Sequence, residues 1–184
     1  GMFQSCNTLT KIDLKSFNTL ELENMADMFN GCTNVTNIVL GSFDVSKVNN
    51  MSGTFRDCLY LTTLDLSSWN LNPSSGYVTA NNMFNGDLRL KTVNVSNGWR
   101  PTSIKANTDM FTGCTAIAGA TSWNGSATST MANGDSGYLT MAQVEIKLNY
   151  ISYSGNTGTQ GKVSGAVGSV VELPIPVDNG YVFG

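Results

Sequence analysis

The sequence contains no histidine, although it is 184 residues long. Histidine is the commonest general base, so its absence removes the Ser-His and Cys-His nucleophile pairs and most zinc sites. Charged residues are also scarce, at 12% of the chain against about 25% in an average domain. The 10 basic and 13 acidic residues form no basic stripe, which argues against a nucleic-acid partner.

Long apolar runs and familiar catalytic motifs are missing as well. No apolar stretch approaches the roughly 20 residues of a membrane-spanning helix, so we expect no membrane insertion in this part of the protein. The four cysteines lack C-x-x-C spacing, and no P-loop, EF-hand loop or G-x-G-x-x-G motif opening a helix is present. We therefore expect no enzyme activity, no bound metal and no cofactor.

What the sequence does contain is an internal repeat. A phenylalanine recurs at spacings of 26, 26, 29 and 27 residues, at Phe3, Phe29, Phe55, Phe84 and Phe111. Apolar residues follow at fixed distances, and each unit ends in an aromatic, at Phe17, Phe43, Trp69, Trp99 and Trp123. Such a repeat is the signature of a stacked repeat architecture.

Each unit shows two apolar periods. Apolar residues around the phenylalanine are separated by steps of three, four and three residues, as in Val48, Met51, Phe55 and Cys58. This spacing predicts one face of a short helix. The pattern L-x-x-L-x-L follows at Leu61 to Leu66 and predicts a short strand. One helix and one strand per unit predict an α/β fold, a leucine-rich-repeat solenoid with a parallel concave sheet and short convex helices.

Two columns of the repeat carry specific expectations. Cys6, Cys32, Cys58 and Cys114 share one inward column. Neighbouring helices pack about 8–10 Å apart, whereas bridged Cα atoms lie within about 7 Å, so we expect free thiols. A polar residue follows the closing aromatic, at Asn18, Asp44, Asn70 and Asn124, and we interpret this column as a structural ladder that hydrogen-bonds backbone. Asp87 interrupts the cysteine column, which puts the regularity of the fourth turn in doubt, and the weak fifth turn predicts a capping end of the array.

The repeat pattern ends near residue 143, and an alternating pattern of β-forming residues begins there. We expect residues 1–142 to form the repeat domain and residues 143–184 a small, truncated all-β module with strands at "VEIKLNYISYSG" and "SVVELPIP". The insertion "NPSSG" at 72–76 predicts a bulging loop. The chain opens inside a repeat, so we expect it to extend upstream of Gly1.

These residues resemble a known family. The phrase "MF-x-x-C-x-x-L-x-x-L-D-L-S-x-F/W-N" and the closing "MANGDSGYLT" resemble the BspA-like leucine-rich repeat proteins of bacterial surfaces, over roughly Met2 to Met141. The tail is similar to the first part of a Listeria–Bacteroides repeat module. The resemblance implies a bacterial, secreted or cell-surface location and a role in adhesion and protein binding.

A candidate binding surface follows from the strand period. Side chains between the core residues of each strand point outward. The candidates are Lys11, Asp13, Lys15, Asn37, Val39, Thr63, Asp65, Ser67, Thr92 and Asn94. They differ from turn to turn, which is what a tailored surface would show and also what an unconstrained one would show. The partner would be a protein or glycan on a host or neighbouring cell.

Two alternatives remain beside this interpretation. The chain could be a passive spacer or stalk within a larger surface protein. An enzyme is the third reading, because Asp13 and Asp65 occupy one column and would lie roughly 10 Å apart across one intervening strand, near the separation of an inverting glycosidase pair. The sheet face is open, and nothing there would remove water from either acid. We therefore favour two solvated carboxylates over a catalytic pair.

Overall fold

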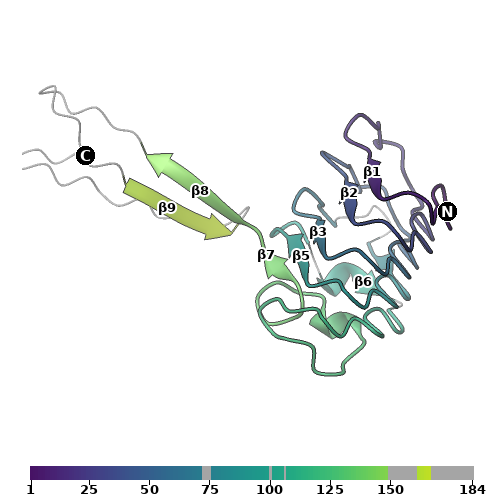
Figure 1. Ribbon diagram of the computed structural model, residues 1–184. Helices are drawn as coiled ribbons and strands as arrows, with labels where there is room; N and C mark the ends of the chain where they lie inside the picture. The colour runs from purple at the N-terminus through teal and green to yellow at the C-terminus, as the bar shows by residue number, and fades with distance from the viewer. Residues whose placement is uncertain (72–75, 100, 106, 149–160, 167–184) are drawn as a thin grey trace, which may run out of the picture.

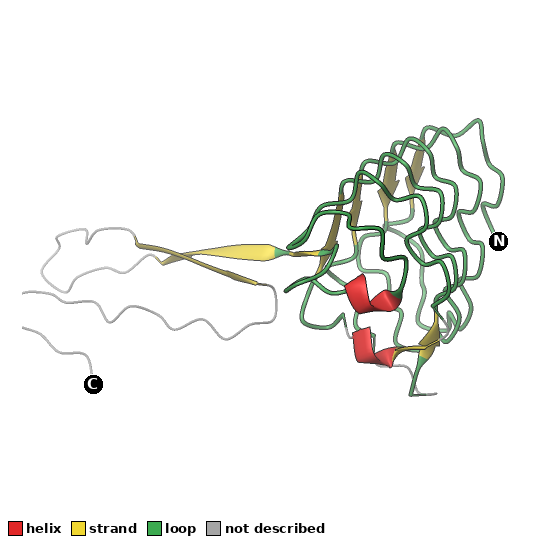
Figure 2. Ribbon diagram, turned by 90° about the horizontal axis from the view of Figure 1, so that it is seen from below, coloured by secondary structure: helices red, strands yellow, loops and turns green. Residues whose placement is uncertain are grey.

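The computed structural model describes residues 1–71, 76–99, 101–105, 107–148 and 161–166. This part of the chain consists mostly of short parallel strands and turns, stacked side by side in chain order (Figure 1). Its helical segments are two 3-10 helices of three residues each, η1 (Pro101–Ser103) and η2 (Ser129–Met131), drawn in red in Figure 2. None of the described helices is long and apolar enough to cross a membrane.

The strands of the repeat units pair in parallel. β1 (Lys11–Asp13) pairs with β2 (Asn37–Val39), and β3 (Thr63–Asp65) pairs with β5 (Thr92–Val95), which in turn pairs with β7 (Thr140–Met141). In every repeat strand the middle apolar residue is buried while its neighbours face outward, as the period-two pattern predicts. The sheet is divided, because β2 and β3 lie side by side without a described ladder between them.

Two further strand pairs are present, and only one of their four strands was expected from the sequence. β4 (Val78–Thr79) and β6 (Ile104–Lys105) form a second small parallel pair. β8 (Gln143–Leu148) and β9 (Gly161–Ala166) form an antiparallel pair, and β8 overlaps the first part of the expected strand "VEIKLNYISYSG". The expected strand "SVVELPIP" and the predicted loop at 72–75 lie outside the described residues.

The predicted convex helices are wrong. The segments with three-four-three spacing are chains of turns, in which hydrogen bonds join residues three apart, such as Cys58 N–H to the Phe55 carbonyl at 3.2 Å. Alternate N–H groups leave the segment and donate to the next turn of the stack: Phe29 to Thr54 at 2.8 Å and Phe55 to Met83 at 2.9 Å. These bonds form a second ladder, opposite the strands, that holds the turns together.

Left-handed backbone explains why no helix forms. Two columns, two residues before and two residues after the phenylalanine, take positive φ in almost every unit. The first column is Asp27, Gly53, Asn82 and Asp109, and the second is Ser5, Gly31, Asp57, Gly86 and Gly113. A right-handed helix cannot contain such residues, and short polar residues and glycine are the types that tolerate this conformation.

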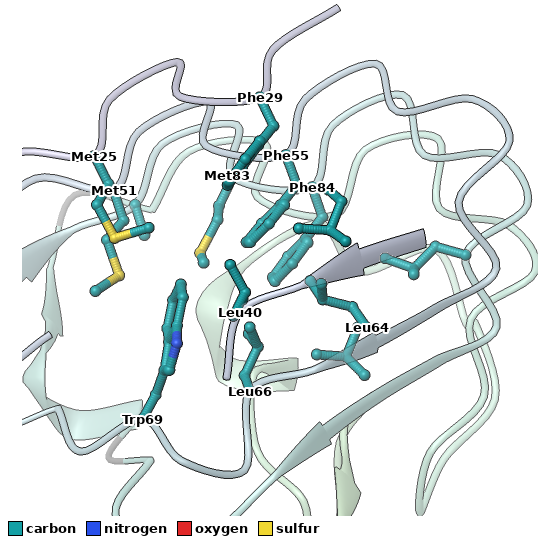
Figure 3. Close-up of a cluster of buried hydrophobic side chains, with 14 of the residues drawn as sticks. Met25, Phe29, Leu40, Met51, Phe55, Leu64, Leu66, Trp69, Met83 and Phe84 are labelled. Atoms are coloured by element: carbon teal, nitrogen blue, oxygen red, sulfur yellow. The ribbon is translucent and has the colours of Figure 1, made fainter. Parts of the chain in front are cut away.

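The core lies between the strands and this turn ladder. The five phenylalanine rings stack in one column, with centroids 5.4 to 5.7 Å apart and planes within 14° of parallel. Leucines from the strands reach toward them from the other side, as Figure 3 shows for Leu40, Leu64 and Leu66. Tyr138 closes the column at one end, edge-on to Phe111 at 5.3 Å. The fifth turn is thus closed by a cap, as its weak repeat pattern predicts.

The cysteines are free, as predicted. Cys6 is half-buried and the other three are buried. Each buried thiol donates to the phenylalanine carbonyl of the preceding turn, for example Cys114 Sγ to the Phe84 oxygen at 2.8 Å. Burial raises the pKa of the Cys58 and Cys114 thiols, so these groups stay protonated and unreactive.

Asp87 occupies the position in the fourth turn that cysteine occupies in the other turns. Its side chain is fully buried, and its Oδ1 accepts the Cys58 N–H at 2.8 Å. The turn ladder continues through this unit, from Phe84 to Met110 at 2.9 Å. The fourth turn is therefore regular, and the doubt that the sequence raised about it was wrong.

The polar column after the closing aromatic hydrogen-bonds the backbone of its own turn. The side chains of Asn18, Asp44 and Asn124 each accept the N–H group two residues further on, at 2.8 to 3.1 Å. This confirms the predicted structural role for these three members.

Candidate binding face

The strand face consists of the outward side chains of β1, β2, β3 and β5. Ladder register aligns these side chains within each strand pair, and each pair contributes to two rows. Lys11 is opposite Asn37, and Thr63 is opposite Thr92. In the second row Asp13 is opposite Val39, and Asp65 is opposite Asn94. Both rows rest on a buried row, Ile12, Ile38, Leu64 and Val93.

Exposure falls along the face. Lys11, Asp13, Asn37, Thr63 and Asp65 are exposed in the first three turns. In the fourth turn Thr92 and Asn94 are half-buried, and β7 pairs with β5 at Asn94. The accessible part of the face therefore belongs to β1, β2 and β3.

The remaining candidates lie at the margins of this face. Lys15 follows β1 and is exposed, while Ser67 follows β3 and is half-buried. Val39 is also half-buried and stands between the two aspartates. Asp13 and Asp65 are on separate ladders, so the structure brings the predicted residues onto one surface but does not draw these two carboxylates together.

Asp13 is held as a carboxylate. The backbone N–H of Lys15 donates to its Oδ1 at 3.2 Å, and the Lys11 ammonium lies 3.6 Å from its Oδ2. The hydrogen bond from Lys15, followed by the neighbouring lysine charges, lowers the pKa of the Asp13 carboxyl below its usual value. Asp65 accepts the Ser67 N–H at 3.0 Å in the same way. Each aspartate thus closes the turn after its strand and leaves its carboxyl group exposed to solvent.

Two hollows adjoin the carboxyl ends of the strands. The larger has a volume of about 420 Å³ and is lined by Ser96, Asn97, Trp99, Asn133, Asp135 and Met141 among others. The smaller, of about 300 Å³, lies over the aromatic turns of the second and third units and is lined by Ser42, Asp44, Ser46, Ser68 and Asn70 among others. Sequence reasoning missed the larger one, because its walls come from β5 and from a loop nearly 40 residues later that belongs to no repeat column.

The polar groups of the described residues are the ones that a partner could contact. Among them, no three histidine, cysteine, aspartate or glutamate side chains are grouped so as to hold an ion. The face instead offers amides, hydroxyls and charges of both signs, which can form hydrogen bonds and ion pairs with a partner.

A family assignment rests on the repeat that builds this face. Residues 1–116 and 73–143, which together span 1–143, match the family described as Mycoplasma protein of unknown function, DUF285. The chain belongs to the DUF285 family. DUF285 is a repeat family of surface proteins, which is compatible with the resemblance to BspA-like proteins. No curated protein matches the chain, and no solved structure matches it.

Proposed function

We propose that this chain is the binding module of a cell-surface protein and that it recognises a protein or glycan through the strand face. One observation carries the proposal: five polar side chains are exposed on β1, β2 and β3, while the middle residue of each of these strands is buried in the core. Lys11, Asp13 and Asp65 give this surface charges of both signs.

Rigidity supports this choice of surface. Each outward residue is flanked by a buried neighbour, such as Ile12 at 4% and Leu64 at 2% exposure. A surface that is already ordered loses little conformational entropy on binding. Mixed charges allow it to select a polar partner by electrostatic complementarity rather than by hydrophobic capture.

The finer family and fold assignment is part of the proposal. We infer a leucine-rich repeat solenoid of the BspA type, in which the strand face is concave and the protein is displayed outside the cell for adhesion. The 26- to 29-residue period and the buried L-x-x-L-x-L columns support it. The convex side differs from the usual pattern, since turns stand where helices were expected.

A passive spacer is the second candidate. The stack of similar turns, followed by the β8–β9 hairpin, favours it, since arrays of small modules can hold another domain away from the cell. A spacer needs no specific ligand, so binding experiments separate the two.

The test is a screen of the purified chain against matrix proteins and glycans, repeated with the double variant Asp13→Lys, Asp65→Lys. Both side chains are exposed, so the variant should fold and lose binding. The matched control is Glu21→Lys, Glu23→Lys, which changes the net charge equally at exposed positions outside the strands. If the strand-face variant binds as the parent does, the site lies elsewhere. If no ligand is found at all, the spacer is favoured.

A further inference from the structure

The larger hollow, beside the carboxyl ends of β5 and β7, has no part in the proposed strand face. Its volume of about 420 Å³ lies in the lower part of the range of about 300–1,000 Å³ for small-molecule sites. Residues 95–97 and 99 form one wall, and residues 133–136 with Met141 form the other. None of the candidate residues of the strand face is among these lining residues, so the larger hollow is a separate place for a ligand.

Hydrogen bonds hold the two walls of the larger hollow in place. The indole N–H of Trp99 donates to the Ala132 carbonyl at 2.8 Å, which ties the later loop to the fourth turn. Within that loop, Asn133 Oδ1 accepts the Ser136 N–H at 2.8 Å and the Ser136 hydroxyl at 3.1 Å. The hollow is therefore formed before a ligand enters, which reduces the entropy lost on binding.

Part of the lining of the larger hollow is apolar. This part consists of Val95, Trp99 and Met141. Because the only polar atom of Trp99 is already bonded to Ala132, the indole offers a ligand carbon surface alone. Gly134 lets Met141 pack closely, since a Cβ at position 134 would collide with the methionine sulfur. The apolar lining can make dispersion contacts with the C–H groups of a ligand.

Three polar side chains of the lining have hydrogen-bonding capacity to spare. Ser96 is buried, at 7% exposure, and its Oγ accepts the Gly98 N–H at 3.2 Å. No residue in the described part of the chain accepts the hydrogen of that hydroxyl. Asn97 and Asp135 are exposed, and neither side chain forms a hydrogen bond or ion pair with another described residue. The three together offer a hydroxyl donor, an amide that donates and accepts, and carboxyl oxygens that accept.

We propose that the larger hollow binds a neutral sugar unit of a glycan. Each sugar hydroxyl both donates and accepts hydrogen bonds, so neighbouring hydroxyls on one ring can satisfy Ser96, Asn97 and Asp135 together. The C–H groups of the same ring can pack against Trp99 and Met141.

Other small ligands match the lining of the larger hollow less well. An anionic ligand would lie beside the acidic side chain of Asp135. An ammonium group only donates hydrogen bonds, so it would leave the Ser96 hydroxyl and the Asn97 amide N–H without an acceptor. The sugar site is separate from the strand face, so either proposal can hold without the other.

Titration of the isotopically labelled chain with methyl glycosides, followed by NMR, tests the sugar site. The neutral probes are the methyl glycosides of glucose, galactose, mannose and N-acetylglucosamine. At least one should shift the backbone amide signals of Asn97 and Asp135 and the indole signal of Trp99, with a dissociation constant of about 1 mM. Methylammonium and the anionic methyl glucuronide should leave these signals in place.

Matched variants locate the bound sugar. Asp135→Asn and Asn97→Ala each remove a hydrogen-bonding group from the lining and should weaken binding about tenfold. Both positions are exposed, so the variants should melt as the parent does. Glu23→Gln and Asn49→Ala make the same kinds of change at exposed residues outside the hollow and should leave sugar binding unchanged.

Three results would overturn the sugar site. The first is that no neutral probe shifts the signals of the hollow, and the second is that the hollow variants bind as tightly as the parent. The third is that methylammonium or methyl glucuronide shifts the same signals as strongly as the neutral sugars. If a sugar shifts only the signals of Asp13, Asn37 and Asp65, glycan binding belongs to the strand face. That outcome supports the proposed function and overturns the second site.

Discussion

Replacing Asp87 with cysteine should stabilise the protein at neutral and alkaline pH and should do so much less in acid. Asp87 is fully buried, and only one of its carboxyl oxygens has a hydrogen-bond partner. Loss of hydration, reinforced by the nearby Asp57 charge and opposed by the Cys58 N–H, raises the pKa of the Asp87 carboxyl well above its usual value. Folding therefore requires this group to keep its proton or to ionise without water.

The sign of the pH dependence follows from linkage. Below the ordinary aspartate pKa of 3.8 the carboxyl is protonated in both the folded and the unfolded chain. Above it the unfolded chain releases the proton while the folded chain retains it, so the free energy of unfolding falls as pH rises toward the raised folded pKa. The contribution of Asp87 is thus most favourable in acid and is lost on the alkaline side.

Part of the gain is the same at every pH and comes from the unpartnered oxygen, and the proton that the folded chain retains adds a part that grows with pH. A buried polar group without a hydrogen bond costs about 1–3 kcal/mol. Cysteine is the residue that the other units place in this column, and its thiol should donate to the Phe55 carbonyl as Cys114 does to Phe84. For a chain of this size the gain corresponds to a rise in Tm of roughly 2–12 °C near pH 8.

The assay is urea unfolding of the parent and of Asp87→Cys under reducing conditions, at about pH 4 and about pH 8. Other titrating groups, including Asp13 and Asp44 with their lowered pKa values, are present in both proteins and cancel in the difference. The difference in unfolding free energy should grow with pH. If the difference in unfolding free energy is equal at both pH values, Asp87 does not retain a proton in the folded chain. If the variant is less stable than the parent, burying Asp87 does not carry the proposed cost.

Three further predictions concern the core and the turns. Phe55→Ala removes the central ring of the stacked column and should cost about 3–5 kcal/mol, a large share of a typical total of about 5–15 kcal/mol; a melting curve close to that of the parent would contradict its place in the core. Thiol titration should count four free cysteines in the denatured chain but a rapid reaction in the native protein of Cys6 alone, since the others are buried; loss of hydrogens in the unreduced mass would show a disulfide. Gly53→Ala should destabilise more than Gly125→Ala. Both glycines have positive φ, which costs alanine about 1–2 kcal/mol, but only at Gly53 would the added Cβ collide with Asp27 Oδ1; equal losses on urea unfolding would contradict this.

The sequence alone predicts which residues face the core. The phenylalanine column, the cysteine column and the buried middle residue of each strand follow from the spacing of apolar residues, because one repeated spacing puts equivalent side chains on the same side of every turn. The exposed positions of β1, β2 and β3 follow from the same pattern, so the most accessible part of the candidate face was predictable.

The tertiary structure decides where the backbone hydrogen bonds go. The three-four-three spacing of Val48, Met51, Phe55 and Cys58 suits a helix and a chain of turns equally, since both place these side chains on one side. The choice depends on a neighbouring turn 26 to 29 residues away, whose carbonyls accept every second N–H group, and on left-handed residues such as Gly53 that allow this. The proton on Asp87, the closing strand β7 and the hollow beside Trp99 likewise arise from contacts between distant segments, which no local pattern in the sequence records.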